Sequence, residues 1–581
     1  MATLDYREAS AIARKRRAAN IAAFYKTPTW NEADLPQNLT DFALKSGYYT
    51  SDELTIIQSE AYVLLEKIKT KAWTALRVTQ AFCKASALAQ ELTNCVTEVL
   101  YAEAHERAKY LDDYLARTGK TIGPLHGLPI SLKDCFITAP HPSSIGMAAY
   151  ANEPLEKDTL LVTILRNLGA VFYIKTNVPT AMMMAETNNN IWGECRNPLH
   201  KHLSPGGSSG GEGALIAFKA SPLGVGTDIG GSIRIPAAWS NLYGLKPSFG
   251  RYPVYGGRSG IPGQELVLAV NGPMSRSLKS LQLYSEAVLS EQVAPWELDH
   301  KLVPIPWRKN VIQPPGRKLR FGIIGIDDGL VTVHPPVERA LNMTKQALKK
   351  QGHEVFTWSA AEDHPVIVKV MSLLISDQHI YNFFHSTDIC IPQNLQAAFF
   401  DLGGAAITEL LKPWDEPIFP CMRGYVQAAG AGEGDLGPTK MRMMTLLRNE
   451  LQKAHLDRWN ATATADGKPR MDGIICATSP WAAPRLGQTQ QNLYVGWTGF
   501  VNYLDFPACT FPVTFADRAL DWPRDMKTFR QLSEIDGRIQ ADYDADFYHG
   551  APVALQIVGK RLEEEKVLEM CEVVANALKD A

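Results

Sequence analysis

The spacing of apolar residues predicts that the first 120 residues are mostly helical. Ser51 and Asp52 can cap a first helix, because their side chains can accept bonds from free backbone amides. The apolar positions of that helix recur at close to the helical period: Leu54, Ile57, Tyr62, Leu65 and Ile68. Further helical patterns cover 78–92 and 98–116. We therefore expect residues 1–120 to form an N-terminal helical region packed on a core.

From residue 158 onward, helical patterns alternate with short apolar strands. A helix from Asp158 to about Gly169 leads into the β-branched and aromatic run 170–174. A similar unit has a strand at 319–324, a turn at 327–329, a helix at 335–351 and a strand at 353–356. Further buried strands are predicted at 472–477, 508–513 and 553–558. This alternation predicts an α/β fold.

Two segments interrupt the alternation. The stretch 370–420 is rich in aromatic residues, namely Tyr381, Phe383, Phe384, Phe399 and Phe400. It is either a lid inserted over a site or an insertion that packs on the surface of the core. Residues 519–548 are rich in Asp and Arg and predict a long surface loop. We therefore expect a core at 121–360, an inserted helical and aromatic lid region at 361–470, and the rest of the core at 471–581.

Composition and the absence of targeting segments exclude several classes of function. Apolar residues make up 45% of the chain, as in an ordinary globular protein. The chain has 59 basic and 61 acidic residues, so we expect no basic surface for nucleic acid. The nine cysteines include no Cys-x-x-Cys pair and predict a reduced, intracellular protein. The first residues lack the apolar segment of a secretory signal, and no apolar run is long enough for a membrane helix. We therefore expect a cytoplasmic protein without an integral membrane segment.

A glycine- and serine-rich stretch, 204–213, reads Ser-Pro-Gly-Gly-Ser-Ser-Gly-Gly-Glu-Gly. It differs from a flexible linker because it runs directly into the apolar segment 214–218. A Walker phosphate loop would need a lysine where this chain has Glu212. A nucleophile elbow must follow a buried strand, yet 197–202 contains a proline and no β-branched run. The stretch therefore predicts backbone packed closely against another part of the protein.

Two further segments carry candidate chemistry. The cluster 224–236 places Ser232 directly after Gly230 and Gly231, whose backbone amides can converge as an oxyanion hole requires. Lys133 ends an apolar, strand-like run, where a solvated lysine would be unusual, although a surface lysine is the ordinary alternative. His200 and His202 have no third candidate ligand near in sequence, so we expect no metal.

Together these segments resemble the amidase signature family. The pattern Gly-Gly-Ser-Ser-Gly-Gly, followed by Thr-Asp-Ile-Gly-Gly-Ser with its last serine 24 residues after Ser208, is highly specific. The similarity extends over about 50–575 through flanking matches at 175–179, 186–190, 243–247 and 551–556. It is strongest to the acetamidase-type general amidases of fungi, a group that includes urethane-hydrolysing members, and extends to fatty acid amide hydrolase. The resemblance implies a single α/β/α amidase-signature core around a large mixed β-sheet, with N-terminal helices and an inserted lid region.

Residue by residue, the resemblance places a catalytic triad on Lys133, Ser208 and Ser232. It implies that Ser232 attacks the amide carbonyl to give an acyl-enzyme, and that Ser208, whose peptide bond to Gly207 is cis in the family, relays the proton. Lys133 then acts as the base, so burial must lower its pKa from about 10.4 towards neutrality. No metal, cofactor or histidine is needed.

The resemblance also implies the residues around the substrate. The oxyanion hole maps onto the backbone amides of Ile229, Gly230, Gly231 and Ser232. Further substrate-binding positions are Met182, Gly207, Thr227 and Asp228. Met182 begins a run of three methionines that either fills the core or lines an adaptable pocket.

The expected activity is hydrolysis of small aliphatic or aryl amides, and of carbamates, to an acid plus an amine or ammonia. Alternatives are a fatty-acid (N-acylethanolamine) amide hydrolase and the glutamine-hydrolysing subunit of an amidotransferase complex, which would need a partner protein. A catalytically inactive scaffold is disfavoured because all three triad positions are present. The expected partner is a small-molecule amide or carbamate, with a homodimer left open.

Overall fold

One mixed β-sheet runs through a computed structural model that describes residues 5–360, 362–371, 405–419, 422, 437–465 and 467–580. Its eleven strands are, in spatial order, β1 (Val96–Val99), β3 (Val171–Thr176), β2 (Pro129–Lys133), β4 (Gly224–Asp228), β6 (Val270–Ser275), β5 (Tyr243–Lys246), β10 (Ala508–Phe515), β11 (Pro552–Val558), β9 (Gly473–Ala477), β7 (Arg320–Ile323) and β8 (Glu354–Thr357). β2 is parallel to β3 and β4, and β7 is parallel to β8 and β9. The remaining pairs are antiparallel. The predicted α/β fold around a mixed sheet is therefore confirmed.

Every strand predicted from the sequence is present, and the strands that were not predicted lack a strong apolar pattern. β3, β7, β8, β9, β10 and β11 occupy the six predicted segments, and β2 ends at Lys133. β4, β5 and β6 were not predicted, because glycine or proline interrupts their apolar residues. β1 lies in the region expected to be helical, and the helix predicted from Glu98 begins only at Tyr101. One sheet thus contains strands from residues 1–120, 121–360 and 471–581.

The N-terminal region is otherwise helical, as expected. Its helices are α1 (Tyr6–Ala22), α2 (Leu39–Lys45), α3 (Ser51–Gln58), α4 (Ala61–Lys69), α5 (Ala75–Thr93) and α6 (Tyr101–Thr118). The segment predicted as one helix is two, because Ser59 and Glu60 are extended between α3 and α4. The cap is Thr50 rather than Ser51 or Asp52, since its hydroxyl accepts the Glu53 amide at 3.2 Å.

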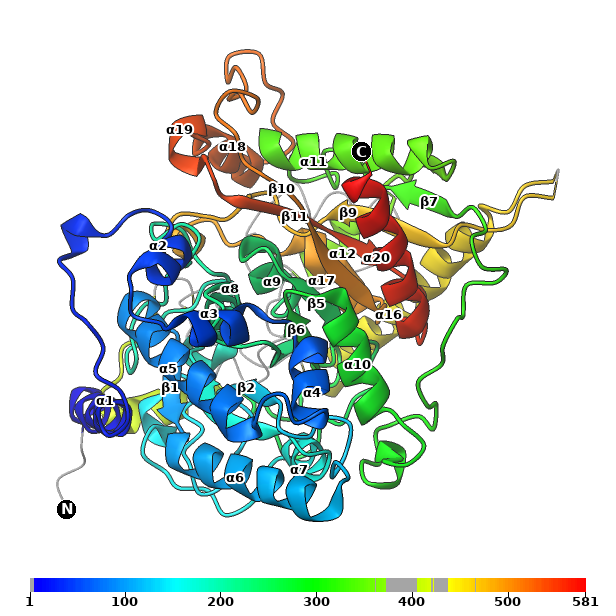
Figure 1. Ribbon diagram of the computed structural model, residues 1–581. Coiled ribbons are helices and arrows are strands. Elements are labelled where there is room, and N and C mark those ends of the chain that lie inside the picture. Colours follow the sequence, from blue (N-terminus) through cyan, green and yellow to red (C-terminus); the bar gives the residue numbers. More distant parts are fainter. Residues whose placement is uncertain are drawn as a thin grey trace.

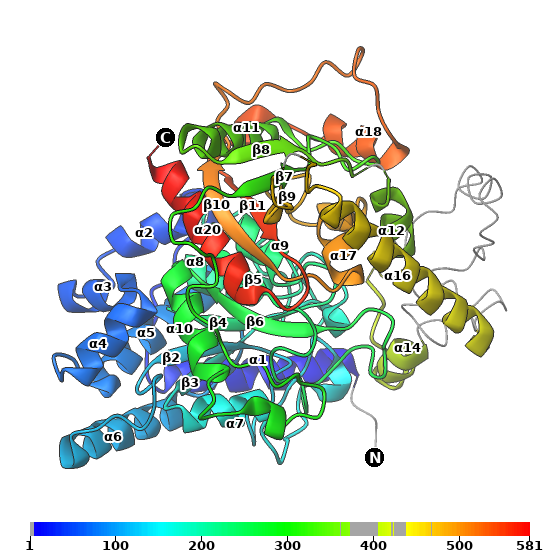
Figure 2. The ribbon, with the colours of Figure 1, turned by 90° about the vertical axis from the view of Figure 1, so that its right-hand side faces the viewer.

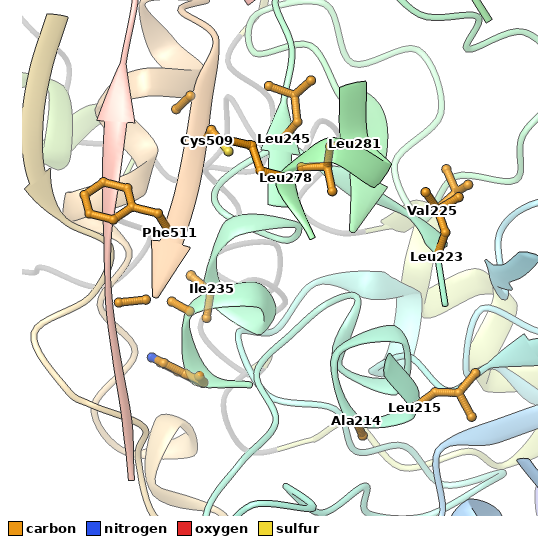
Figure 3. Packing of buried hydrophobic residues seen from close by; sticks show 14 of the residues in the cluster. Ala214, Leu215, Leu223, Val225, Ile235, Leu245, Leu278, Leu281, Cys509 and Phe511 are labelled. Carbon is orange, nitrogen blue, oxygen red and sulfur yellow. The ribbon is translucent and has the colours of Figure 1, made fainter. Parts of the chain in front are cut away.

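Short side chains let two helices approach one face of the sheet closely. A Cβ on Gly226 would contact Ser209, and one on Gly244 would lie 2.8 Å from the Ala237 side chain. α8 (Gly210–Ala217) and α9 (Arg234–Trp239) therefore pack directly on the strands. Leu245 points to the opposite face, towards Leu278 and Leu281 of α10 (Leu278–Val288), as Figure 3 shows. α20 (Glu564–Lys579) also packs on β10 and on α10.

The remaining helices lie around this core. They are α7 (Leu160–Asn167), α11 (Pro335–Lys350), α12 (His364–Met371), α14 (Ala405–Leu411), α16 (Gly437–Asn460), α17 (Gly496–Tyr503), α18 (Glu534–Ala541) and α19 (Ala545–Tyr548). The blue N-terminal helices gather together in Figure 1. In Figure 2, α2–α6 lie on one side of the molecule, and α12, α14, α16 and α17 lie on the other.

The two segments that interrupt the predicted alternation are the expected surface loop at 519–548 and the expected lid. Residues 519–548 are not one long loop, because Ser533 caps α18 and Asp544 caps α19. The aromatic residues of the expected lid, from Tyr381 to Phe400, lie outside the described residues. Within the described ranges, no helix is both long and apolar enough to cross a bilayer.

A buried ion cluster fastens α20 to the loop after β5. The Arg251 guanidinium donates to Glu564 at 2.8 Å and to Glu565 at 2.6 Å, and all three side chains are almost completely buried. Glu564 also accepts the Ser248 amide, and Arg308 donates to Glu565. Removing one partner of such a cluster leaves buried charge without compensation.

We therefore predict that Arg251→Leu lowers the free energy of unfolding by about 3–5 kcal/mol. Chemical denaturation followed by circular dichroism measures this loss. The control is Arg77→Leu, because the pair of Arg77 with Asp52 is largely exposed and contributes about 0–1 kcal/mol. Equal losses in the two variants would contradict the assignment.

Candidate active site

Lys133 and Asp228 end two adjacent parallel strands, β2 and β4, at the same edge of the sheet. Side chains at the carboxyl ends of parallel strands meet there, which is where α/β proteins commonly place functional groups. Two chain segments cover this edge. One leads into α8 and carries Ser208, and the other leads from β4 into α9 and carries Ser232. The topology therefore gathers the three glycine- and lysine-containing segments singled out in the sequence.

The Lys133 amine lies between two hydroxyl groups. Its Nζ is 2.7 Å from Ser208 Oγ and 2.6 Å from Thr227 Oγ1, and the side chain has no exposed surface. Burial lowers the pKa of Lys133 to about 8, although Cys135, Asp228 and Glu212 oppose this shift. A substantial fraction of the amine is therefore neutral in the pH range where enzymes usually work.

Ser208 is held by close backbone packing. The Gly207–Ser208 peptide bond is cis, and a Cβ on Gly207 would lie 2.5 Å from the Met184 carbonyl oxygen. The stretch is buried and continues into α8, whose residues are all buried. The prediction of a glycine-rich loop packed against another part of the chain and opening an apolar helix is confirmed.

Ser232 is placed beside this segment by backbone bonds. The Ser209 amide donates to the Ser232 carbonyl at 3.2 Å, and Ser209 Oγ accepts the Thr227 amide at 3.3 Å. Ser232 is partly exposed, as are Ile229 and Gly230. In the described part of the chain, the amides of Ile229, Gly230 and Ser232 have no hydrogen-bond acceptor. They are thus free to bind an oxygen atom.

The fourth predicted oxyanion donor is already engaged. The Gly231 amide donates to Asp228 Oδ1 at 2.9 Å, and the amides of Ile233 and Arg234 donate to Asp228 Oδ2. Asp228 is therefore the residue that shapes this loop.

Asp228 does not fit its expected role as a substrate-binding residue. It is completely buried, and the Arg234 guanidinium and the Asn502 amide donate to it. Burial alone would raise the pKa of Asp228, but Arg234 overcomes this and holds the pKa well below its usual range. Since the carboxylate is ionised and occupied by internal donors, it organises the site without facing the substrate.

The sequence analysis did not predict that residues from the C-terminal part of the chain bind Arg234 and the loop that carries Ser232. Arg234 also donates to Gln556 Oε1 at 2.9 Å and to the Thr498 carbonyl at 3.1 Å. Thr498 Oγ1 in turn donates to the Gly230 carbonyl at 2.6 Å. One signal was available: Arg234 interrupts the apolar run 233–239, and a buried arginine requires acceptors.

The methionine run lies against the cis peptide segment. Met183 and Met184 are buried, whereas Met182 is partly exposed and packs on the main apolar core. Ala181 and Met182 both have positive φ, at 53° and 61°, a conformation that bulky residues rarely adopt. Such strain is typical of segments held in place for a function.

The arrangement suits nucleophilic acyl transfer. It combines two neighbouring serine segments, a buried amine of lowered pKa and backbone amides free to receive negative charge. Among the residues that the structure describes, no cluster of three His, Cys, Asp or Glu side chains could hold a metal.

Known sequences similar to this chain include amidases. A family model described as "Amidase" matches residues 77–568. The acetamidase of Emericella nidulans is 37% identical, with 99% of this chain and 98% of that protein covered. The acetamidase of Aspergillus oryzae is 33% identical over the full length of both chains.

Solved structures agree. Fatty acid amide hydrolase superimposes with a TM-score of 0.87 and 29% identity, covering 100% of this chain and 97% of that one. One component of the glutamyl-tRNA(Gln) amidotransferase from Thermotoga maritima, at a TM-score of 0.61 and 16% identity, shares the fold over 88% of this chain and 93% of its own. The chain belongs to the amidase family.

Proposed function

We propose that this protein is a serine amidase that hydrolyses small aliphatic or aryl amides, and carbamates, to an acid plus an amine or ammonia. The observation that carries the proposal is the hydrogen bond between the fully buried Lys133 amine and Ser208, beside the Ser232 segment. The full-length similarity to two fungal acetamidases supports the choice of small amides.

In the proposed reaction, Ser232 Oγ attacks the amide carbonyl while its proton passes through Ser208 Oγ to the neutral amine of Lys133. Thr227 Oγ1, 2.6 Å from Lys133 Nζ, holds the amine in place. The tetrahedral intermediate collapses when the resulting Lys133 cation returns the proton, through Ser208, to the leaving nitrogen. Water then attacks the acyl-enzyme by the same relay and releases the acid.

The developing negative charge on the carbonyl oxygen is assigned to the amides of Ile229, Gly230 and Ser232. These amides are free of internal acceptors among the described residues, and converging amides are the usual stabilisers of such charge. Gly231 contributes by its bond to Asp228, which fixes the loop.

A fatty-acid amide hydrolase is the second candidate, because fatty acid amide hydrolase matches this chain over its whole length. In either case Met182 is assigned to the wall of the acyl pocket. The amidotransferase alternative is supported by fold similarity alone. A cytoplasmic location and a homodimer stay predictions.

The assignment of the nucleophile is tested with Ser232→Ala. We expect no acyl-enzyme and no labelling by a fluorophosphonate, because the attacking oxygen is gone. In the wild-type enzyme, peptide mass spectrometry is expected to find the label on Ser232. Ser208→Ala and Lys133→Ala are expected to lower the rate by about 10²–10⁴, the usual contribution of general-base catalysis. A label on Ser208 would reverse the two serine roles, and near-wild-type turnover of Ser232→Ala would overturn the mechanism.

The pH dependence follows from the lowered pKa of Lys133. Only the neutral amine accepts a proton, so kcat/KM is expected to rise with pH and to level off above the pKa of about 8. Initial rates with a neutral amide between pH 6 and 10 measure this limb. A rate that falls with pH across this window contradicts a lysine base, and so does a limb that persists in Lys133→Ala.

Substrate preference is tested by comparing kcat/KM for short aliphatic, aryl and C16–C20 acyl amides. An apolar pocket discriminates by only about 1–3 kcal/mol per methylene, so we expect broad use of short and aryl amides. A clear preference for the longest chains would favour the lipid-amide alternative.

A further inference from the structure

Glu212 is a carboxyl group with no surface exposure, in the first turn of the helix that follows Ser208. Its two oxygens accept hydrogen bonds from hydroxyl groups, from Ser131 Oγ at 2.6 Å and from Thr176 Oγ1 at 2.8 Å. Hydroxyl donors satisfy a carboxylate without neutralising it. A buried carboxyl group with this environment requires an explanation, since burying charge is costly.

The two hydroxyl partners flank Lys133 in the sheet. Thr176 is the register partner of Lys133 across the parallel β2–β3 pair. Ser131 precedes Lys133 by two residues in β2, so both side chains project from the same face. Glu212 therefore lies on the face of the sheet from which the Lys133 side chain extends. Gly224 of β4 leaves the room, because a Cβ there would overlap the Glu212 carboxylate.

The other acidic groups near Lys133 are either paired with a cation or neutral. The Asp228 carboxylate is paired with the Arg234 guanidinium at 3.1 Å. The Cys135 thiol is neutral below the alkaline range, since burial raises its pKa to about 11. This leaves the Glu212 carboxyl as the neighbour whose charge is not offset by an arginine.

The groups around Glu212 itself are also neutral or hydroxylic. Ser221 Oγ lies 2.9 Å from Ser131 Oγ, whose single hydroxyl proton is donated to Glu212. Burial raises the pKa of Tyr173 well above its usual value and that of Cys95 to about 12. Among the described residues around Glu212, Lys133 is therefore the group that can carry a positive charge towards it.

We propose that Glu212 is a positioning residue of the acyl-transfer site, which ties α8 to β2 and β3 through Ser131 and Thr176 and sets the proton affinity of Lys133. The inference rests on the proposed role of Lys133 as the base. Ser208 and Glu212 lie on one short segment, so the same contacts fix the distance between Ser208 and Lys133.

The expected ionisation of Glu212 defines the direction of the effect. Burial raises the pKa of Glu212 to about 7, so the carboxyl group is ionised in the range where Lys133 loses its proton. An anion close by favours the charged form of a lysine. Removing this charge lowers the pKa of Lys133, and the neutral base then forms at lower pH.

The experiment compares the pH profile of kcat/KM for the wild-type enzyme and Glu212→Gln, which keeps the size of the side chain and removes its charge. One hydroxyl then accepts from the new amide nitrogen instead of donating. We expect the rising limb to move to lower pH by about one unit. A purely structural brace would lower kcat and leave the limb in place. The matched control is Glu186→Gln, because Glu186 is also buried with a pKa raised to about 7 but accepts a bond from Thr489 instead. Its limb is expected to stay at the wild-type position.

A limb that does not move in Glu212→Gln overturns the inference, and so does an equal shift in Glu186→Gln. If Glu212→Gln does not fold, Ser131→Ala is the second variant: losing one donor weakens the Glu212 anion, so a smaller shift in the same direction is expected. An unmoved limb there also overturns the inference. Lys133→Ala distinguishes failure of the proposed function from failure of this inference. High activity in Lys133→Ala would refute Lys133 as the base. If Lys133→Ala is inactive and the rising limb of Glu212→Gln stays at the wild-type pH, only the role of Glu212 is refuted.

Discussion

The Lys133 amine sits at the end of β2 with no access to water, yet it must remain in contact with Ser208. Burial makes the ammonium form costly, and this cost is what provides a basic amine near neutral pH. The site can exist only if neighbouring segments exclude solvent and supply hydroxyl partners. The approach of α8 to the sheet, the closeness of Gly207 to Met184 and the bond from Thr227 all serve this condition.

Much of the architecture was accessible from the sequence because it is encoded locally. Runs of β-branched and aromatic residues identified six strands, and the glycine-rich stretch before 214–218 identified the buried start of α8. Strands without such runs were missed: β4 reads Gly-Val-Gly-Thr-Asp because its glycines make room for helices, a requirement of packing that periodicity does not reveal. The cap of α3 is Thr50 and not the predicted Ser51 or Asp52, because Glu53 lies three residues after Thr50 and completes a capping box with it.

The parts of the site that could not be predicted depend on residues distant in sequence. Asp228 was assigned to the substrate from its place in the motif, and its partner Asn502 lies 274 residues away. Arg234 meets Gln556 across 322 residues. These pairs are set by the order of strands in the sheet, in which β5, from the first half of the chain, pairs with β10 from the last.

This strand order has a consequence for how the protein is made. A ribosome that has released the chain only to residue 480 has already presented Lys133, Ser208 and Ser232, but not Thr498, Asn502 or Gln556. Because contacts between such distant segments form late, the loop after β4 is expected to stay unanchored until residues 498–556 have been synthesised. The nascent chain would therefore present Ser208 and Ser232 before the contacts that fix the loop after β4 exist, and the arrangement of the site would be completed only when the segment 498–556 folds onto it.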